Sequence, residues 1–319
     1  MDSSSQTISV VIPAFNEAGN IRPLVEAVEK MFRESGLKGE MLLVNDGSTD
    51  DTLAIANELA ATHDFLRVRS YKPNRGLTYA LETGFKDANG DILVFYPADL
   101  QYSPDDIPRM IEKVNEGYDI VTGWKQGNYS KKRVSAIYNW LSRVLFKVTV
   151  HDLNSVKAFR REVIDVLDFR PDFHRYMVVM AVQAGFTAGE VKVPLYERTS
   201  GKSKFGSPWR ILVGLLDLVS VWFQYSFLRK PLLFFGAGGI ICLLAGFVLG
   251  IVSLYLRYVL QLGFRPLLTL VAMLVSLGVT LFGLGFLGES VNETNRRVGR
   301  IEAGLKQKQG SERSADSDE

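Results

Sequence analysis

The sequence predicts an α/β domain with a mostly parallel sheet flanked by helices, followed by an interfacial helix and a two-helix transmembrane hairpin. Short apolar runs alternate with amphipathic stretches through residues 7–205, as strands and helices do in parallel sheets. Charges then become rare, because residues 231–288 carry only Arg257 and Arg265. This change in composition marks the boundary between a soluble domain and a membrane segment.

The soluble domain begins with an apolar strand over residues 8–12, and a helix follows from about Asn20. The next elements are predicted at 41–44 (strand), 51–61 (helix), 66–68 (strand), 76–87 (helix) and 92–96 (strand). In open α/β sheets, ligands bind at the carboxyl ends of the strands. The polar loops after three of these strands are therefore the first candidates for a site, and they cover residues 13–17, 45–52 and 97–103.

Two apolar stretches further along the chain, 231–256 and 266–287, contain no charged residue. At about 1.5 Å per residue, each can span the ~30 Å hydrocarbon core of a bilayer. Basic residues precede the first stretch and follow the second, whereas the connection between them carries only two arginines. By the positive-inside rule, both termini and the leading domain are expected in the cytoplasm, in a multi-pass protein of the cell membrane.

A third apolar stretch, 211–228, contains Asp217 near its middle. Placing that carboxylate at the bilayer centre would cost about 2.5–3.5 kcal/mol, so an interfacial helix is the better prediction. Residues 133–150 also have an amphipathic pattern, which fits either a second interfacial helix or an ordinary core helix. The predicted organisation is a cytoplasmic domain (1–205), an interfacial juxtamembrane helix (206–230), two transmembrane helices (231–288) and a basic, polar cytoplasmic tail (289–319).

Composition and motifs argue against several classes of function. The formal net charge is +2, which provides no global basic field for a nucleic-acid partner. Cys242 is the single cysteine, so neither an intramolecular disulfide nor a cysteine-ligated zinc finger can form. The soluble domain contains neither the GxGxxG nor the GxxxxGK motif, so the dinucleotide-binding and phosphate-loop interpretations lose their main support.

Five motifs occur in order along the soluble domain: VVIPAFNE (10–17), VNDGSTDDT (44–52), NRGLTYALETGF (74–85), PADLQ (97–101) and RTSGKSKF (198–205). Together they resemble the family 2 glycosyltransferases with a GT-A fold. The resemblance is greatest to the polyprenyl-phosphate branch, which includes dolichol-phosphate mannose synthase and bacterial undecaprenyl-phosphate glucosyltransferases. It implies an inverting enzyme that moves a sugar from a nucleotide-sugar to undecaprenyl or dolichyl phosphate at the inner membrane, with UDP-glucose favoured as donor over GDP-mannose.

The same resemblance implies which residues bind the donor. Those around the nucleotide base and ribose would be Pro13, Phe15, Glu17 and Asp46. A carboxylate can accept hydrogen bonds from a base N–H or a ribose hydroxyl, which agrees with this role. Asp46 has an alternative, as the cap of the helix that follows its strand. A second group resembles the motif that closes over the donor phosphates and consists of Arg198, Ser203 and Lys204.

A metal site is implied in the loop after the strand at 92–96. Relatives carry an Asp-x-Asp there, whose carboxylates hold Mg²⁺ or Mn²⁺ on the donor diphosphate. This chain has Pro97 at the first acidic position, which leaves Asp99 and Gln101 as the oxygen ligands. One carboxylate with an amide oxygen can suffice for Mg²⁺, because substrate phosphates and water complete its shell. The departure also leaves a metal-independent enzyme open.

A phosphate acceptor explains why no general base is evident. A phosphate monoester with a second pKa near 6 is already a nucleophilic anion at pH 7, so the site needs cations that position it. Lys125 and Arg133 are the predicted acceptor contacts, together with Asn154 of the HDLNSVKAF segment (151–159). The predicted catalytic set is Asp99, Lys125, Arg133 and Asp152.

Two alternatives remain at this stage. Transfer to the hydroxyl of diacylglycerol or ceramide would require a base, and Asp152 is the candidate. A non-catalytic scaffold that binds nucleotide-sugar is the other, because Pro97 replaces an acidic residue. The expected partners are a nucleotide-sugar donor, a polyprenyl phosphate and the bilayer, and a homo-oligomer is left open.

Overall fold

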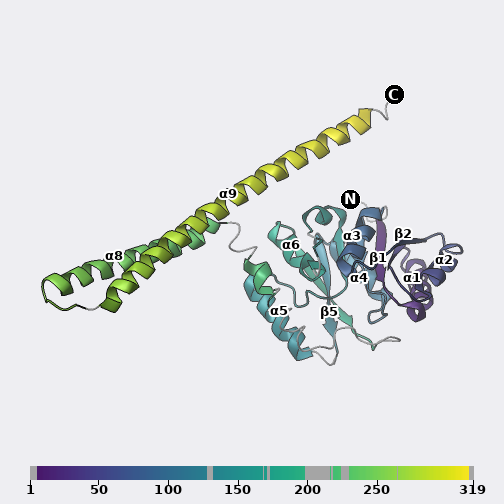
Figure 1. The fold of residues 1–319 in the computed structure, drawn as a ribbon. Helices are drawn as coiled ribbons and strands as arrows, with labels where there is room; N and C mark the ends of the chain where they lie inside the picture. Colours follow the sequence, from purple (N-terminus) through teal and green to yellow (C-terminus); the bar gives the residue numbers. More distant parts are fainter. Residues whose placement is uncertain are drawn as a thin grey trace. The chain divides into compact units, whose positions relative to one another are not determined.

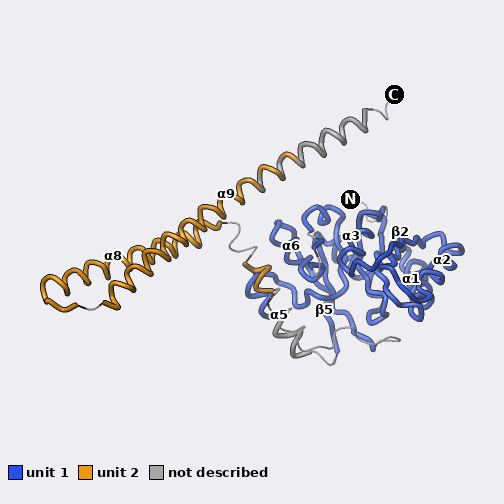
Figure 2. The backbone as a smooth tube through the Cα atoms, viewed as in Figure 1, with its two compact units in different colours: residues 1–211 blue, residues 212–319 orange. Residues whose placement is uncertain are grey.

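The computed structural model describes residues 6–127, 132–167, 169–170, 173–197, 216, 218–223, 230–263 and 265–315, with backbone alone at 132–138, 295–296, 299–300 and 302–315. The chain divides into two compact units, residues 1–211 and 212–319, which Figure 2 distinguishes by colour.

The first unit is built on a seven-stranded sheet with the strand order β3-β2-β1-β4-β6-β5-β7. Figure 1 labels β1, β2 and β5 of this sheet. Among the described strands, β6 alone is antiparallel to its neighbours, β4 and β5, and the other pairings are parallel. The predicted mostly parallel sheet is confirmed. Its strands are β1 (Thr7–Ala14), β2 (Lys38–Asp46), β3 (Leu66–Tyr71), β4 (Ile92–Phe95), β5 (Ile120–Gln126), β6 (Lys157–Arg160) and β7 (Ala188–Pro194).

Helices lie between the strands, as the alternating pattern predicts. The α-helices of this unit are α1 (Ala18–Ser35), α2 (Thr52–Ala60), α3 (Leu77–Asp87), α4 (Ile107–Asn115), α5 (Lys132–Phe146) and α6 (Met177–Gln183). Among the described residues of this unit, three 3₁₀ segments accompany them: η1 (Pro104–Asp106), η2 (Arg161–Val166) and η3 (Phe173–Tyr176). The predicted helices 51–61 and 76–87 match α2 and α3 to within one residue at each end.

The alternation of side chains along β1 places helices on both faces of the sheet. Val10 is buried in a core that also contains Leu24 and Val28 of α1. Val11 points to the opposite face, where a Cβ added to Gly84 of α3 would lie 2.3 Å from its Cγ1. Gly84 therefore lets α3 approach the sheet closely, which explains a glycine inside a helix that it would otherwise weaken.

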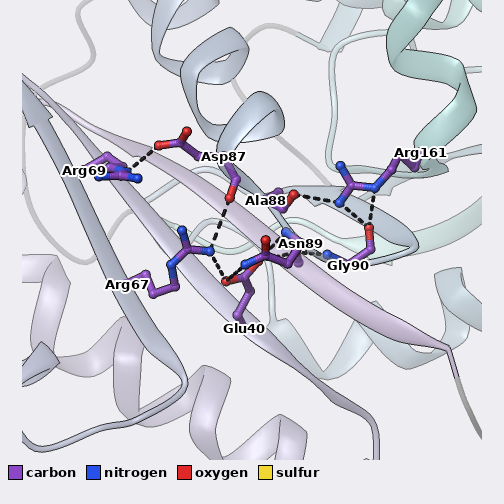
Figure 3. A network of polar contacts seen from close by, with 9 residues as sticks. Glu40, Arg67, Arg69, Asp87, Ala88, Asn89, Gly90 and Arg161 are labelled. Atoms are coloured by element: carbon purple, nitrogen blue, oxygen red, sulfur yellow. Dashed lines mark hydrogen bonds and ion pairs between the residues drawn. The ribbon is translucent and has the colours of Figure 1, made fainter. Parts of the chain in front are cut away.

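A polar network fixes the connection between α3 and β4 at the amino-terminal end of the sheet (Figure 3). The Glu40 carboxylate of β2 accepts hydrogen bonds from Ser9 Oγ (2.7 Å), Asn89 N (2.6 Å) and Arg67 (2.5 Å). Burial acts to raise the pKa of Glu40, but these bonds outweigh it and hold the pKa below its ordinary value. Arg161 binds backbone carbonyls of the same connection. The strand ends opposite the candidate site are thus tied together.

The second unit consists mainly of two long helices. A π-helical turn (Leu232–Gly236) leads into α8 (Ala237–Tyr258), and α9 spans Arg265–Ala315. The segments Leu232–Tyr258 and Arg265–Thr294 are long and apolar enough to cross a membrane. In the 18-residue apolar stretch of each segment, 17% and 6% of the residues are buried. A core helix of a soluble protein would be mostly buried, so these helices fit the predicted hairpin. α9 continues well beyond the end predicted at residue 287.

Two other predicted helices are described only in part. Of residues 206–230, the structure describes 216 and 218–223, which are helical, and residue 230. The helix predicted at 133–150 is α5, which ends earlier, at Phe146, and is followed by Lys147 with a positive φ of 56°. Trp140 and Val144 of α5 are each 57% exposed.

Candidate active site

The carboxyl ends of β1, β2, β4 and β5 lie at one edge of the sheet, because these strands share a direction. The three polar loops singled out in the sequence leave the sheet at this edge, after β1, β2 and β4. Pro13, at the end of β1, pairs in register with Val44 of β2. The tertiary structure therefore gathers these loops, as the strand rule predicts.

The loops after β1 and β2 are hydrogen-bonded to each other. The backbone N–H of Asn16 donates to Ser48 Oγ (3.0 Å), and the N–H of Thr49 donates to Asn16 Oδ1 (2.8 Å). The N–H of Glu17 donates to Thr52 Oγ1 (2.8 Å). Asn16 has a φ of 56°, a left-handed conformation that asparagine tolerates better than most residues. The two loops thus form one rigid wall of the candidate site.

An open cavity adjoins this wall. Its lining combines an aromatic ring with small polar groups and includes Phe15, Ser48, Thr49, Lys72, Pro73 and Asn74. An apolar surface with a few placed polar groups is typical of a pocket for a nucleobase and ribose. Another hollow lies at the opposite edge of the sheet, against Asp91 and Arg161, and no predicted site residue lines it. Glu17 lies beside the wall, and its carboxylate accepts a hydrogen bond from Asn20 (2.7 Å).

Asp46 anchors the loop that leads into α3. The residue is only 4% exposed. Its carboxylate accepts hydrogen bonds from the N–H of Arg75 (2.7 Å), the N–H of Gly76 (2.9 Å) and Asn74 Nδ2 (2.9 Å). Burial, and then the negative charge of Asp46, raise the pKa of the neighbouring Tyr71. The alternative role of Asp46 as the cap of the next helix is wrong, because that helix, α2, begins after Asp51. Asp46 instead accepts hydrogen bonds from the residues that lead into α3.

Asp99 and Gln101 lie close together in the loop after β4. The N–H of Gln101 donates to Asp99 Oδ1 (3.3 Å), and Leu100 between them has a φ of 54°. Tyr196 N donates to Gln101 O (2.8 Å), which ties this loop to the segment after β7. Within the described part of the chain, no group of three or more His, Cys, Asp or Glu residues is placed to hold a metal. One carboxylate and one amide fit a cation that brings substrate phosphates and water as its other ligands.

Of the predicted acceptor and catalytic residues, Lys125, Asp152 and Asn154 form a compact cluster between β5 and β6. Lys125 Nζ lies 3.4 Å from Asp152 Oδ2 and donates to the carbonyl of Asn154 (2.5 Å). Asp152 Oδ1 accepts from the N–H of Asn154 (2.9 Å), and Thr122 Oγ1 donates to the carbonyl of Asp152 (2.9 Å). The side chains of Lys125 and Asp152 are 13% and 3% exposed. Asp152 is thus part of a largely buried ion pair.

Lys157 belongs to the same cluster, although it is not among the site residues predicted from the sequence. It begins β6 and is fully buried, and its Nζ donates to the carbonyl of Ser155 (2.8 Å). The sequence signal for it is a lysine inside the apolar run Val156 to Phe159. Burying a charge there costs free energy unless the charge is paired or has a function.

His151 precedes this cluster and fixes its backbone. The ring Nδ1 of His151 and its backbone N each lie 2.7 Å from a carboxylate oxygen of Glu190. The ring also stacks on Trp124, with centroids 4.1 Å apart. These contacts give His151 a structural role beside the cluster.

The remaining predicted site residues are described incompletely or not at all. Arg133 lies in α5, where the structure gives its backbone but not its side chain. The group that resembles the motif over the donor phosphates, Arg198, Ser203 and Lys204, lies outside the described residues. Their roles stay predictions.

Comparison with known proteins agrees with this geometry. The model of the family "Glycosyl transferase family 2" matches residues 9–168. Dodecaprenyl-phosphate galacturonate synthase of Rhizobium johnstonii is 32% identical over 307 residues, covering 92% of this chain and 90% of that protein. Undecaprenyl-phosphate 4-deoxy-4-formamido-L-arabinose transferase of Klebsiella pneumoniae is 28% identical over 296 residues, covering 89% and 88%.

A solved structure supports the fold independently. Glucosyl-3-phosphoglycerate synthase from Mycobacterium tuberculosis, in complex with Mn²⁺, UDP and glucosyl-3-phosphoglycerate, superposes with a TM-score of 0.55 at 24% identity. The match covers 68% of this chain and 81% of that one. The family match, the full-length relatives and the shared fold lead to one conclusion: the chain belongs to glycosyl transferase family 2 and is a glycosyltransferase.

Proposed function

We propose that this protein transfers a sugar, with inversion, from a nucleotide-sugar to a polyprenyl phosphate at the cytoplasmic face of the inner membrane. The observation that carries the proposal is that two groups of polar residues lie at the same end of the sheet. The Asp99 and Gln101 loop follows β4, and the Lys125 cluster lies at the end of β5. The names of both full-length relatives contain a polyprenyl phosphate, which supports this class of acceptor.

The chemistry requires little from the protein beyond positioning and charge. An acceptor phosphate oxygen attacks the anomeric carbon of the sugar, and the bond from that carbon to the diphosphate breaks on the opposite face. Because the phosphate is already an anion at pH 7, no side chain has to remove a proton. Lys125, Arg133 and Asn154 would hold the acceptor, and Asp152 would orient Lys125.

The residues present fit a divalent cation that arrives with the donor. Asp99 and Gln101 would hold Mg²⁺ or Mn²⁺ against the donor diphosphate. The cation would supply positive charge that stabilises the leaving diphosphate. A site with a single carboxylate should bind metal weakly in the absence of the donor.

The donor site is proposed at the wall formed by the loops after β1 and β2. The cavity beside Phe15 suits the base and ribose, with Pro13, Glu17 and Asp46 nearby in these loops. Arg198, Ser203 and Lys204 would contact the donor phosphates. UDP-glucose is the first donor to test and GDP-mannose the second. UDP-galacturonate joins them because one relative's name contains galacturonate.

The membrane arrangement is part of the proposal. The domain 1–205 would face the cytoplasm, 206–230 would lie at the interface, 231–288 would cross the bilayer twice and 289–319 would return to the cytoplasm. The two apolar helices support the crossing. The exposed Trp140 and Val144 of α5 would suit contact with the headgroup region, where tryptophan is enriched.

The decisive experiment is transfer of radiolabelled sugar from each donor to undecaprenyl phosphate in detergent, with Mg²⁺, Mn²⁺ or EDTA. Lipid-linked product should form with metal, disappear with EDTA, and fall at least about 100-fold in Asp99→Ala, as when a group that stabilises transition-state charge is removed. Asp105→Ala, which removes an exposed carboxylate nearby, is the matched control and should stay active.

The same assay tests the alternatives. Product with diacylglycerol or ceramide, but none with undecaprenyl phosphate, would replace the proposed acceptor with an alcohol. Nucleotide binding without any product would contradict the proposed transfer.

A further inference from the structure

Lys157 is a fully buried lysine at the sheet edge that carries the candidate site. It pairs in register with Phe95, the last residue of β4, and with Thr122 of β5. Its Nζ donates to the carbonyl of Ser155 and lies 5.4 Å from the centroid of the Phe95 ring. A methionine of similar length would fill this space without the cost of removing an ammonium group from water. A lysine here therefore points to a use for its charge.

Two charged groups act on Lys157: Lys125 of β5 and Asp152 of the segment before β6. Burial lowers the pKa of Lys157 most, Asp152 raises it and Lys125 of β5 lowers it, which leaves the pKa at about 7. His174 of η3 also faces this region, and its Nδ1 lies 3.1 Å from Thr78 Oγ1. Burial lowers the pKa of His174 to about 3, so that ring is neutral at pH 7. The charge balance of the cluster thus depends on Lys125, Asp152 and Lys157.

Counting these charges shows what Lys157 changes. Lys125 and Asp152 together are neutral, and their ion pair of 3.4 Å is largely shielded from water. Lys157 Nζ and Lys125 Nζ donate to the neighbouring backbone carbonyls of Ser155 and Asn154, and protonated Lys157 adds one positive charge to the cluster. In a medium of low dielectric constant, one carboxylate among two ammonium groups leaves net positive charge for a third, anionic partner.

We propose that Lys157 is a positioning residue that shares the charge of Asp152 and so keeps the Lys125 ammonium available to the acceptor phosphate. This inference rests on the proposed function, where Lys125 contacts that phosphate. Without Lys157, Asp152 and Lys125 form a closed neutral pair, and the incoming phosphate has to compete with Asp152 for Lys125. The loss should therefore appear in acceptor binding more than in turnover of bound acceptor.

The test measures binding of farnesyl phosphate, a soluble polyprenyl phosphate, to the full-length protein in detergent by calorimetry. Lys157→Met should weaken binding about tenfold, because the phosphate then has to compete with Asp152 for the Lys125 ammonium. The double variant Lys157→Met with Asp152→Asn restores the net charge of the cluster and should bind within about threefold of wild type. Lys30→Met, which removes an exposed lysine of α1, should bind like wild type.

A merely structural role predicts a different pattern. The proposal is overturned if Lys157→Met binds farnesyl phosphate as tightly as wild type, or if the double variant binds no better than the single one. Lys157→Gln, also neutral, carries the same expectation if the methionine variant does not fold. In transfer assays, the acceptor KM should rise in Lys157→Met while kcat changes less.

The failures of the two proposals can be told apart. Wild-type protein that transfers sugar, with a Lys157→Met variant of unchanged acceptor affinity, would refute the role of Lys157 alone. Wild-type protein whose binding of farnesyl phosphate depends on Lys157, but which transfers no sugar, would refute the proposed reaction alone. Absence of farnesyl phosphate binding in wild type would refute the role of Lys157, whatever the transfer assay shows.

Discussion

Asp46 is a buried carboxylate that faces only hydrogen-bond donors in its described contacts. Its oxygens accept from the backbone of Arg75 and Gly76 and from the Asn74 amide. Asp46→Asn replaces one acceptor oxygen by an NH₂ group, which meets those donors unfavourably. We expect the free energy of unfolding to fall by about 1–3 kcal/mol, and UDP affinity to fall with it if the loop supports the donor.

Thermal unfolding and UDP calorimetry check this prediction. Asp51→Asn is the control, because Asp51 is exposed in the loop that follows the same strand. Equal stability of the two variants would contradict the anchoring role of Asp46. At the residue scale, the structure thus separates a carboxylate that holds a loop from one that is free to meet solvent.

At the scale of elements, the Glu40 network links β2 and β3 to the connection that enters β4 (Figure 3). A carboxyl group with a lowered pKa stabilises the fold above its ordinary pKa, here 4.5, and loses that contribution as the pH falls through the folded-state value. We expect Glu40→Gln to be less stable than wild type at pH 7. The difference should shrink below about pH 4.5 as Glu40 becomes protonated.

Chemical denaturation between pH 3 and pH 7 measures this difference. Glu34→Gln removes an exposed carboxylate of α1 and should match wild type throughout. A gap between Glu40→Gln and wild type that stays constant across this range would show that packing, and not charge, explains the contribution of Glu40.

The packing of α8 on α9 depends on glycine at a close approach. A Cβ added to Gly239 would lie 2.7 Å from the carbonyl oxygen of Gly278, a backbone atom that cannot turn aside. We expect Gly239→Ala to destabilise the helix pair by about 1–3 kcal/mol, as overpacking does. Gly283→Ala in α9 is the matched control, since a Cβ there meets nothing within 4 Å.

Thermal unfolding in detergent compares the two alanine variants. Gly283→Ala should be neutral or slightly stabilising, because alanine favours a helix by about 1 kcal/mol over glycine. If both variants unfold at the wild-type temperature, the two helices do not pack at Gly239 in the folded protein.

At the scale of the whole molecule, the proposal places the connection between α8 and α9 on the side of the membrane opposite to the catalytic domain. In a Cys242→Ser background, Gln261→Cys in that connection should react with a membrane-impermeant maleimide in intact cells. Lys30→Cys on α1 should react only after the membrane is permeabilised. Labelling of Lys30→Cys in intact cells would contradict the proposed orientation.

Local patterns anticipated much of the architecture. Alternating apolar runs located β1, β2, β3 and β4, and helical spacing located α2 and α3 to within a residue. Element ends were less predictable, because they depend on contacts with other segments. β2 extends to Asp46 since its last residues pair with β1 and β3, and α5 stops at Phe146 where Lys147 takes a positive φ.

The sequence by itself determined the two long apolar helices and the order of the family motifs, because each depends on a short stretch of chain, and the strand rule predicted which loops share one end of the sheet. Only the tertiary structure showed that Asp46 holds Asn74, that Asp152 pairs with Lys125, and that Lys157 is buried beside them. Asp46 and Asn74, for example, are 28 positions apart. Strand order brings them together, and local periodicity does not encode strand order.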